Sequence, residues 1–309
     1  MAFVAKSNHY SKPSITNDFH LAIKDGRHPV IEKQLPFGEE YIPNDIYLNQ
    51  EDQQIIILTG PNMSGKSALL RQTALIVILA QIGSYVPAKH AEIGLVDKVY
   101  TRVGASDNIS QGESTFMVEM VETAAILNQA DERALVILDE IGRGTETYDG
   151  LSIAWATLEH LHNKNKCRAL FATHYHELTA TSSQLDGVQN ATVSVKEWNG
   201  EIVFLHTVVK GSADRSYGVQ VAKLAGLPKS VIKRAQNILT SLEGASKNRS
   251  ASADLPMFSQ TPSNSKNAEK KDYLGLQLSD LNPDNLTPKE ALQLLYKLKE
   301  FYDEDETPT

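Results

Sequence analysis

The chain has 309 residues, of which 41% are hydrophobic, and this is enough apolar material for one large globular domain or two smaller ones. Its formal net charge of −8, from 30 basic and 38 acidic residues, argues against a basic face for a nucleic-acid backbone. The single cysteine, Cys167, excludes an internal disulfide framework and suits a reducing compartment. The sequence contains neither a run of ~20 apolar residues nor a signal pattern after Met1, so we expect a cytoplasmic protein without a membrane segment.

The first part of the chain has little periodicity. Pro29 biases the backbone of His28 toward an extended conformation, and we interpret His28 as structural rather than as a ligand. Ile46 to Leu48 and Ile55 to Leu58 are predicted strands joined by the polar turn 49–52.

The second of these strands leads into a glycine-containing loop and then into a helix. The loop has the pattern G-x-x-x-x-G-K-[ST], which is typical of a phosphate-binding loop, in the residues Gly60, Pro61, Asn62, Met63, Ser64, Gly65, Lys66 and Ser67. Backbone N–H groups of such a loop hold phosphate oxygens, and glycine lets the backbone come close. We expect Lys66 to reach the β- and γ-phosphates and the Ser67 hydroxyl to bind Mg²⁺. The apolar run from Ala68 to Ile82 predicts a mostly buried helix that ends at Gly83.

A candidate strand at 96–103 is followed by a polar segment that runs into an amphipathic helix at 118–128. Ser110 to Ser114 would lie at or just before the amino end of that helix. Two interpretations stay open from these residues alone, because a helix amino end binds anions and is also where serine acts as a cap.

The apolar run 134–138 predicts a buried strand of a parallel sheet, and two acidic residues follow it directly. Ligands of α/β sheets bind at the carboxyl ends of the strands. With a phosphate-binding loop upstream, Asp139 is the expected carboxylate on the Mg²⁺ side. Glu140 is the expected base for the attacking water.

The next strand is predicted at 168–174, ending at His174, after a helix at 151–161. If the sheet is parallel, His174 lies at the same edge as Asp139. From its position alone, His174 either contacts a γ-phosphate or the attacking water, or is a hydrogen-bonded structural residue.

The last third of the chain is predicted to contain a hairpin and then helices. Strands at 188–195 and 202–208 flank the turn signal Asn199-Gly200. Short helices at 219–226 and 227–242 suggest a helix-turn-helix, for which we favour packing against another chain over DNA reading because it has few basic residues. A polar linker, a final helix starting near Thr287 and an acidic tail complete the sequence.

Four segments together resemble the MutS family of DNA mismatch-repair proteins in residue type, order and spacing. They are TGPNMSGKS at 59–67, GESTFMVEM at 112–120, LDEIGRGT at 138–145 and FATHY at 171–175. The resemblance is dense over residues 20–245 and loose over the last helix.

The resemblance implies an ATPase related to the ABC type that works as a homodimer, with ATP or ADP and Mg²⁺ as ligands. Ser114 would contact the γ-phosphate in trans, His174 would be the switch histidine and Asn62 would help to hold the phosphates. Tyr41 falls at the position of an aromatic residue that stacks on adenine, with Ile42 beside it and His206 on the opposite face of the base. Ala68 replaces a threonine that many members carry, and we expect little effect because Ser67 supplies the hydroxyl ligand.

We therefore expect an α/β fold: a P-loop ABC-type ATPase domain with a mixed or parallel sheet flanked by helices. The expected parts are this domain at 1–215, a helix-turn-helix dimerisation segment at 216–245, a flexible linker at 246–273 and a C-terminal helical segment at 274–309. Family members read mismatched DNA with N-terminal domains that we do not find in this sequence, so we expect a C-terminal fragment. In a whole protein, ATP would switch a DNA clamp that a downstream repair protein recognises.

Three alternatives stay open. Another ABC-like enzyme is disfavoured because transporter members carry an L-S-G-G-Q-type signature, whereas residues 110–116 read SQGESTF. A dimerisation module that holds ATP without turnover is disfavoured by Glu140 and His174. A related protein that acts in recombination has no distinguishing feature in this sequence.

Overall fold

The computed structural model describes residues 2–104, 114–198, 201–212 and 217–250. The chain divides into two compact units, residues 1–236 and 237–309. The first unit holds both β-sheets and the first turns of the last described helix. The predictions for a linker beyond residue 250 and for a final helix concern residues outside those described.

The larger sheet has six strands in the order β10-β9-β4-β8-β7-β6. Neighbouring strands are parallel except for the antiparallel β9–β10 hairpin. The strands are β4 (Ile55–Thr59), β6 (Lys98–Arg102), β7 (Ala134–Asp139), β8 (Arg168–Ala172), β9 (Val188–Trp198) and β10 (Glu201–Lys210). Because β4, β7 and β8 run in the same direction, the residues that follow them gather at one edge of the sheet.

The smaller sheet has four strands in the order β1-β5-β2-β3. They are β1 (Ser14–Thr16), β2 (Leu21–Gly26), β3 (Asn44–Leu48) and β5 (His90–Gly94). The predicted strands around 46–48 and 55–58 therefore both exist but belong to different sheets. The reason is that β3 pairs with β2, with Leu48 opposite Leu21, rather than with β4.

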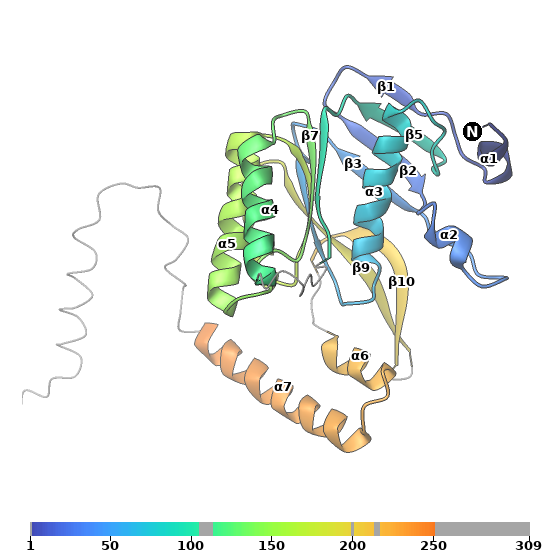
Figure 1. Cartoon of the computed structure of the whole chain (residues 1–309). Helices are drawn as coiled ribbons and strands as arrows, with labels where there is room; N and C mark the ends of the chain where they lie inside the picture. The colour runs from blue at the N-terminus through green and yellow to red at the C-terminus, as the bar shows by residue number, and fades with distance from the viewer. Residues whose placement is uncertain (1, 105–113, 199–200, 213–216, 251–309) are drawn as a thin grey trace, which may run out of the picture. The chain divides into compact units, whose positions relative to one another are not determined.

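Helix α3 (Lys66–Gln81) covers one face of the larger sheet, and α4 (Thr115–Gln129) and α5 (Thr147–His160) cover the other (Figure 1). The other described helices are α1 (Ala2–Ser7), α2 (Ile31–Gln34), α6 (Gly218–Leu224) and α7 (Lys229–Ser250). A π-helical turn, Leu161–Asn165, continues α5, and a 3₁₀ segment, His176–Ser183, follows β8. None of the described helices is long and apolar enough to cross a membrane.

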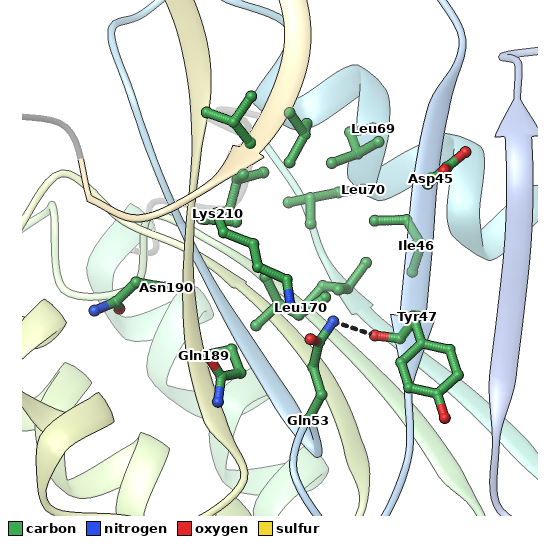
Figure 2. A pocket seen from close by; sticks show the side chains of 15 residues that line it. Asp45, Ile46, Tyr47, Gln53, Leu69, Leu70, Leu170, Gln189, Asn190 and Lys210 are labelled. Atoms are coloured by element: carbon green, nitrogen blue, oxygen red, sulfur yellow. Dashed lines mark hydrogen bonds between the residues drawn. The ribbon is translucent and has the colours of Figure 1, made fainter.

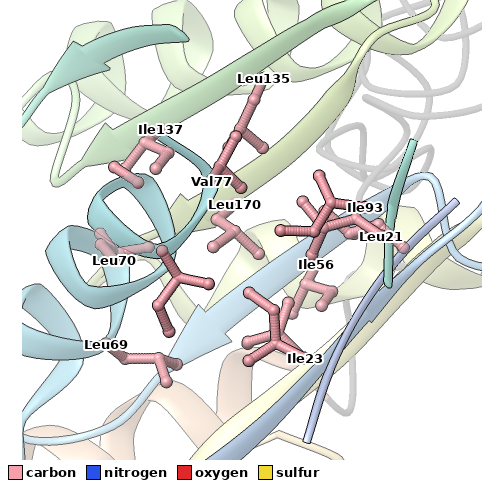
Figure 3. Close-up of a cluster of buried hydrophobic side chains, with 14 of the residues drawn as sticks. Leu21, Ile23, Ile56, Leu69, Leu70, Val77, Ile93, Leu135, Ile137 and Leu170 are labelled. Carbon is pink, nitrogen blue, oxygen red and sulfur yellow. The ribbon is translucent and has the colours of Figure 1, made fainter. Parts of the chain in front are cut away.

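Two apolar cores follow from the alternation of side chains along the buried strands. On one face, Ile56 and Leu170 pack with Leu70 and Val77 of α3 and with Leu21 of the smaller sheet (Figure 3). On the other face, the second core contains Ile57, Phe171, Leu151, Trp155 and Leu158. Because α3 lies between two sheets, it is apolar on most of its surface, as its sequence predicted.

The helices at 218–224 and 229–250 agree with the predicted pair, with one correction. α7 continues to Ser250, five residues into the predicted linker that starts at 246. The strong helix formers Glu243, Ala245 and Lys247 explain the extension, because they offset the nearby glycine, asparagine and serine residues. The turn between the two helices contains Gly226 with φ +85°.

Candidate functional site

The segment between β4 and α3 is a tight loop in which three residues have positive φ. They are Gly60 at +134°, Met63 at +69° and Gly65 at +105°. A Cβ on Gly60 would lie 3.4 Å from the backbone nitrogen of Val193, an ordinary contact distance, so the positive φ rather than lack of space favours glycine here. The predicted strand, glycine-bearing loop and helix are therefore present in this order, and phosphate binding by the loop stays a prediction.

Lys66 is the first residue of α3 and is only 5% exposed. Its Nζ donates hydrogen bonds to the carbonyl oxygens of Gly60 at 2.6 Å and Pro61 at 3.1 Å, and it lies 4.0 Å from a carboxylate oxygen of Glu140. Burial lowers the pKa of Lys66, while the carboxylates of Glu140 and Asp139 act in the opposite direction. The ammonium group is therefore held inside the loop.

Ser67 and Asp139 come together at the carboxyl edge of the sheet. The Ser67 hydroxyl donates to Asp139 Oδ2 at 2.6 Å. Burial raises the pKa of Asp139, and the hydrogen bond from Ser67 opposes that shift. A hydroxyl and a carboxylate side by side offer the oxygen ligands that Mg²⁺ prefers, so the two predicted metal ligands fit that ion.

Glu140 is held in an unusual backbone conformation beside this pair. Its φ is +57°, and its N–H donates to the carbonyl of Ala172 at 2.9 Å. Arg143 Nη1 donates to its carboxylate at 2.5 Å. Non-glycine residues with positive φ cost free energy and gather at functional sites, and the role of Glu140 as the base stays a prediction.

His174 lies two residues beyond the end of β8, the strand next to β7. Partial burial lowers the pKa of His174, and the negative charge of Glu140 raises it. Its ring centroid is 4.1 Å from that of Tyr175. The structure therefore brings His174 to the same edge as Glu140 and Lys66.

A pocket of about 290 Å³ adjoins the loop at Ser64 and Gly65. Tyr41, Ile42 and His206, which the family resemblance assigned to adenine binding, all line it, together with Ala68 and the loop residues Ser64 and Gly65. The Tyr41 hydroxyl donates to Gln72 at 2.9 Å, and burial raises the pKa of Tyr41 to about 12. Asn62 is exposed.

Ser114 is exposed and immediately precedes α4. The next two residues, Thr115 and Phe116, line a pocket of about 370 Å³ together with Ser67, Asp139 and Glu140 of the same chain. Residues 110–113, which the sequence placed with Ser114, lie outside the described residues.

Sequence reasoning missed several residues that support this site. Glu119 of α4 accepts a hydrogen bond from the N–H of Gly142 at 2.7 Å, and the hydroxyl of Tyr175 donates to the Gly142 carbonyl at 2.9 Å. Asn44 and Gln72 contact the two walls of the pocket beside the loop. Glu119 and Tyr175 lie in two of the segments that carry the family resemblance, but no role was predicted for them; Asn44 and Gln72 have no local signal, because each acts through a partner that is distant in sequence.

These features define a mixed α/β protein in which a strand, a glycine loop and a helix face two acidic residues at a strand end. A family model described as MutS domain V matches residues 56–243, and one described as the DNA mismatch repair protein MutS C-terminal region matches residues 268–301. The chain belongs to the MutS family.

Proteins with the name DNA mismatch repair protein MutS are similar over almost the whole chain. The protein from Ruegeria pomeroyi is 58% identical over 97% of this chain, and that from Dinoroseobacter shibae is 57% identical over 99% of it. The protein from Rhodopseudomonas palustris strain BisA53 is 57% identical over 97%. The aligned part covers 35%, 36% and 34% of these three proteins, so the chain spans about a third of their length.

Proposed function

We propose that the chain binds and hydrolyses ATP in a Mg²⁺-dependent reaction. The observation that carries this proposal is the cluster of Lys66, Ser67, Asp139 and Glu140 beside a pocket of a size suited to a nucleotide base. In the proposed complex the loop 60–67 holds the phosphates, with Asn62 beside them. Tyr41, Ile42 and His206 surround the adenine, and Ala68 completes the wall next to the loop.

The reaction is attack of water on the γ-phosphorus, in line with the bond that breaks. The new bond joins the water oxygen to phosphorus, the bond to the β-phosphate oxygen breaks, and the products are ADP and phosphate. Glu140 accepts the proton of the attacking water, His174 orients the water or a γ-phosphate oxygen, and Lys66 stabilises negative charge. Ser67 and Asp139 would hold Mg²⁺, which neutralises charge on the phosphates when it is bound.

We further propose that two copies complete the site, with Ser114 of one copy at the γ-phosphate of the other. The exposure of Ser114 at the start of α4 supports this arrangement. Exposed apolar side chains on α4 and near α6, such as Met117, Val121, Leu224 and Leu227, supply surface for association. In a whole protein of this family, the ATP state would switch a clamp on mismatched DNA and be recognised by a downstream repair protein.

The Glu140→Gln variant tests the reaction. Removing a general base lowers rates by about 10² to 10⁴, so turnover should fall by that factor while Mg²⁺-ATP still binds. Sedimentation with Mg²⁺-ATP should then show accumulation of a dimer. Turnover at the wild-type rate would exclude Glu140 as the base. A wild-type chain that binds ATP but does not turn it over would favour a nucleotide-dependent dimerisation module instead.

A further inference from the structure

Strand β10 is interrupted next to the phosphate-binding loop. Phe204 pairs with Val195, and the next pair along the hairpin joins Val208 to Val193. Four residue steps on β10 therefore match two on β9, so β10 bulges between these pairs. His206 lies within the bulge and has φ +52°, a conformation that costs free energy for a residue with a side chain. Something other than the strand ladder has to hold this segment.

The Asn44 side chain holds it. Asn44 begins β3 and is 8% exposed. Its Nδ2 donates to the carbonyl oxygen of His206 at 2.8 Å, and its Oδ1 accepts from the N–H of Val208 at 2.7 Å. Both ends of one amide thus replace ladder partners that the bulge removes.

The same amide reaches the opposite wall of the pocket. Nδ2 also lies 3.3 Å from the carbonyl oxygen of Ile42, its second acceptor. The neighbouring residue, Tyr41, lines the pocket on that side, and His206 lines the other. One buried side chain therefore links the backbones of both walls.

The wall that Asn44 holds also contacts the loop. His206 Nδ1 lies 2.8 Å from the carbonyl oxygen of Ser64, and a Cβ on Gly65 would lie 3.3 Å from that nitrogen. A shift of the bulge would therefore move His206 away from the loop.

Packing alone does not fix the bulge, because a second hollow lies beside it. This hollow has a volume of about 250 Å³, and Val208 lines both it and the pocket next to the loop. Figure 2 shows the apolar side chains Ile46, Leu69, Leu70 and Leu170 around it. Closely packed side chains resist displacement, whereas a segment beside empty space can shift.

We propose that Asn44 is a positioning residue that sets the separation between the Tyr41–Ile42 wall and His206, and thereby the affinity for the nucleotide base. This inference rests on the proposed function. It assigns Asn44 a role in binding the base and none in holding the phosphates or in the chemical step.

The test compares Asn44→Asp with a matched control, Asn165→Asp. Asn165 is also 8% exposed, and its Nδ2 donates to the carbonyl oxygens of Leu127 and Ala130, near the amino end of β8 and away from the pocket. In both variants a carboxylate oxygen would face two carbonyl oxygens. Titration with Mg²⁺-ADP and with Mg²⁺-tripolyphosphate separates binding of the base from binding of the phosphates.

Asn44→Asp should weaken ADP binding by about tenfold or more, the loss expected for one or two buried hydrogen bonds, and leave tripolyphosphate binding unchanged. Asn165→Asp should change neither. Asn44→Ser keeps one short hydroxyl group and introduces no charge, and it should show the same selective loss of ADP binding. This second variant replaces Asn44→Asp in the test if Asn44→Asp does not fold.

Equal ADP affinity in the Asn44 variants and the wild type would overturn the role of Asn44, and so would an equal loss of affinity for ADP and tripolyphosphate. Neither result would contradict the proposed function. A wild-type chain that binds neither probe would overturn the proposed function and the role of Asn44 with it.

Discussion

At the candidate site, burial shifts the pKa values of three titratable residues in the direction that favours their neutral forms. It raises the pKa of Asp139 and lowers those of Lys66 and His174. The hydrogen bond from Ser67 opposes the shift of Asp139, and the two acidic residues oppose that of Lys66. The charges of the site are therefore balanced against one another in a partly dry environment, where a phosphate chain would interact strongly with them.

His28 is another buried titratable residue, and we interpret its role as structural. It is 6% exposed, and its Nδ1 accepts hydrogen bonds from the backbone N–H groups of Val30 and Ile31 at 3.2 Å each. Only an imidazole that is unprotonated at Nδ1 can accept them. Burial, aided by the charge of Arg71, lowers the pKa of His28.

The His28→Asn variant should be less sensitive to acid than the wild type. As the pH falls below about 6.5, the unfolded chain takes up a proton at this histidine before the folded chain does. The contribution of neutral His28 to stability is thus complete above that pH and is lost below it, by at most about 1.4 kcal/mol per pH unit. Urea unfolding between pH 7 and pH 5 measures the slope. Parallel pH curves for the two proteins would show that His28 does not titrate differently on folding.

At the scale of the elements, three segments meet at Gly142, two residues after Glu140. Glu119 of α4 and Tyr175 beyond β8 bind its N–H and its carbonyl oxygen. Gly142 has φ +87°, and a Cβ there would lie 2.4 Å from the carbonyl oxygen of Gly150 in α5. The position of Glu140 is thus tied to α4, α5 and the segment that carries His174.

Replacing Glu119 should therefore reduce turnover more than ATP binding. Glu119→Ala leaves the N–H of Gly142 without its acceptor, which costs about 1–3 kcal/mol and releases the loop that carries Glu140. Glu119→Gln keeps an acceptor oxygen and should lose less. Glu122→Ala is the control. Glu122 lies on the same helix and pairs with Arg102, whereas the N–H of Gly142 is bonded to Glu119. Steady-state rates and ATP affinities check this, and an equal effect of Glu119→Ala and Glu122→Ala would contradict it.

At the scale of the whole molecule, local patterns predicted the larger sheet and the residues at its carboxyl edge. The loop 60–67 and the pair Asp139–Glu140 carry recognisable spacing, and the parallel strands bring them together. The smaller sheet was missed because β1, β2 and β5 are short and lack a clear alternation. The pocket beside the loop joins residues far apart in sequence, and only the family resemblance indicated Tyr41 and His206.

Arg168 is another long-range feature that no local pattern reveals. It is fully buried at the start of β8, and its guanidinium donates to four backbone carbonyl oxygens. These belong to Phe19, Gly94, Leu95 and Arg133, so one side chain links both sheets. Its partners are identifiable only once the chain has folded.

Binding of Mg²⁺-ATP by calorimetry tests the central claim most directly, with Glu140→Gln as the parent to prevent turnover and Lys66→Ala added to it. Lys66 is held inside the loop by two carbonyl oxygens and lies beside Glu140. A hydrogen bond from a charged donor is worth about 1.5–3 kcal/mol, so the double variant should bind ATP at least about tenfold more weakly than its parent. Equal affinity in the two proteins would contradict the assignment of residues 60–67 as the nucleotide site.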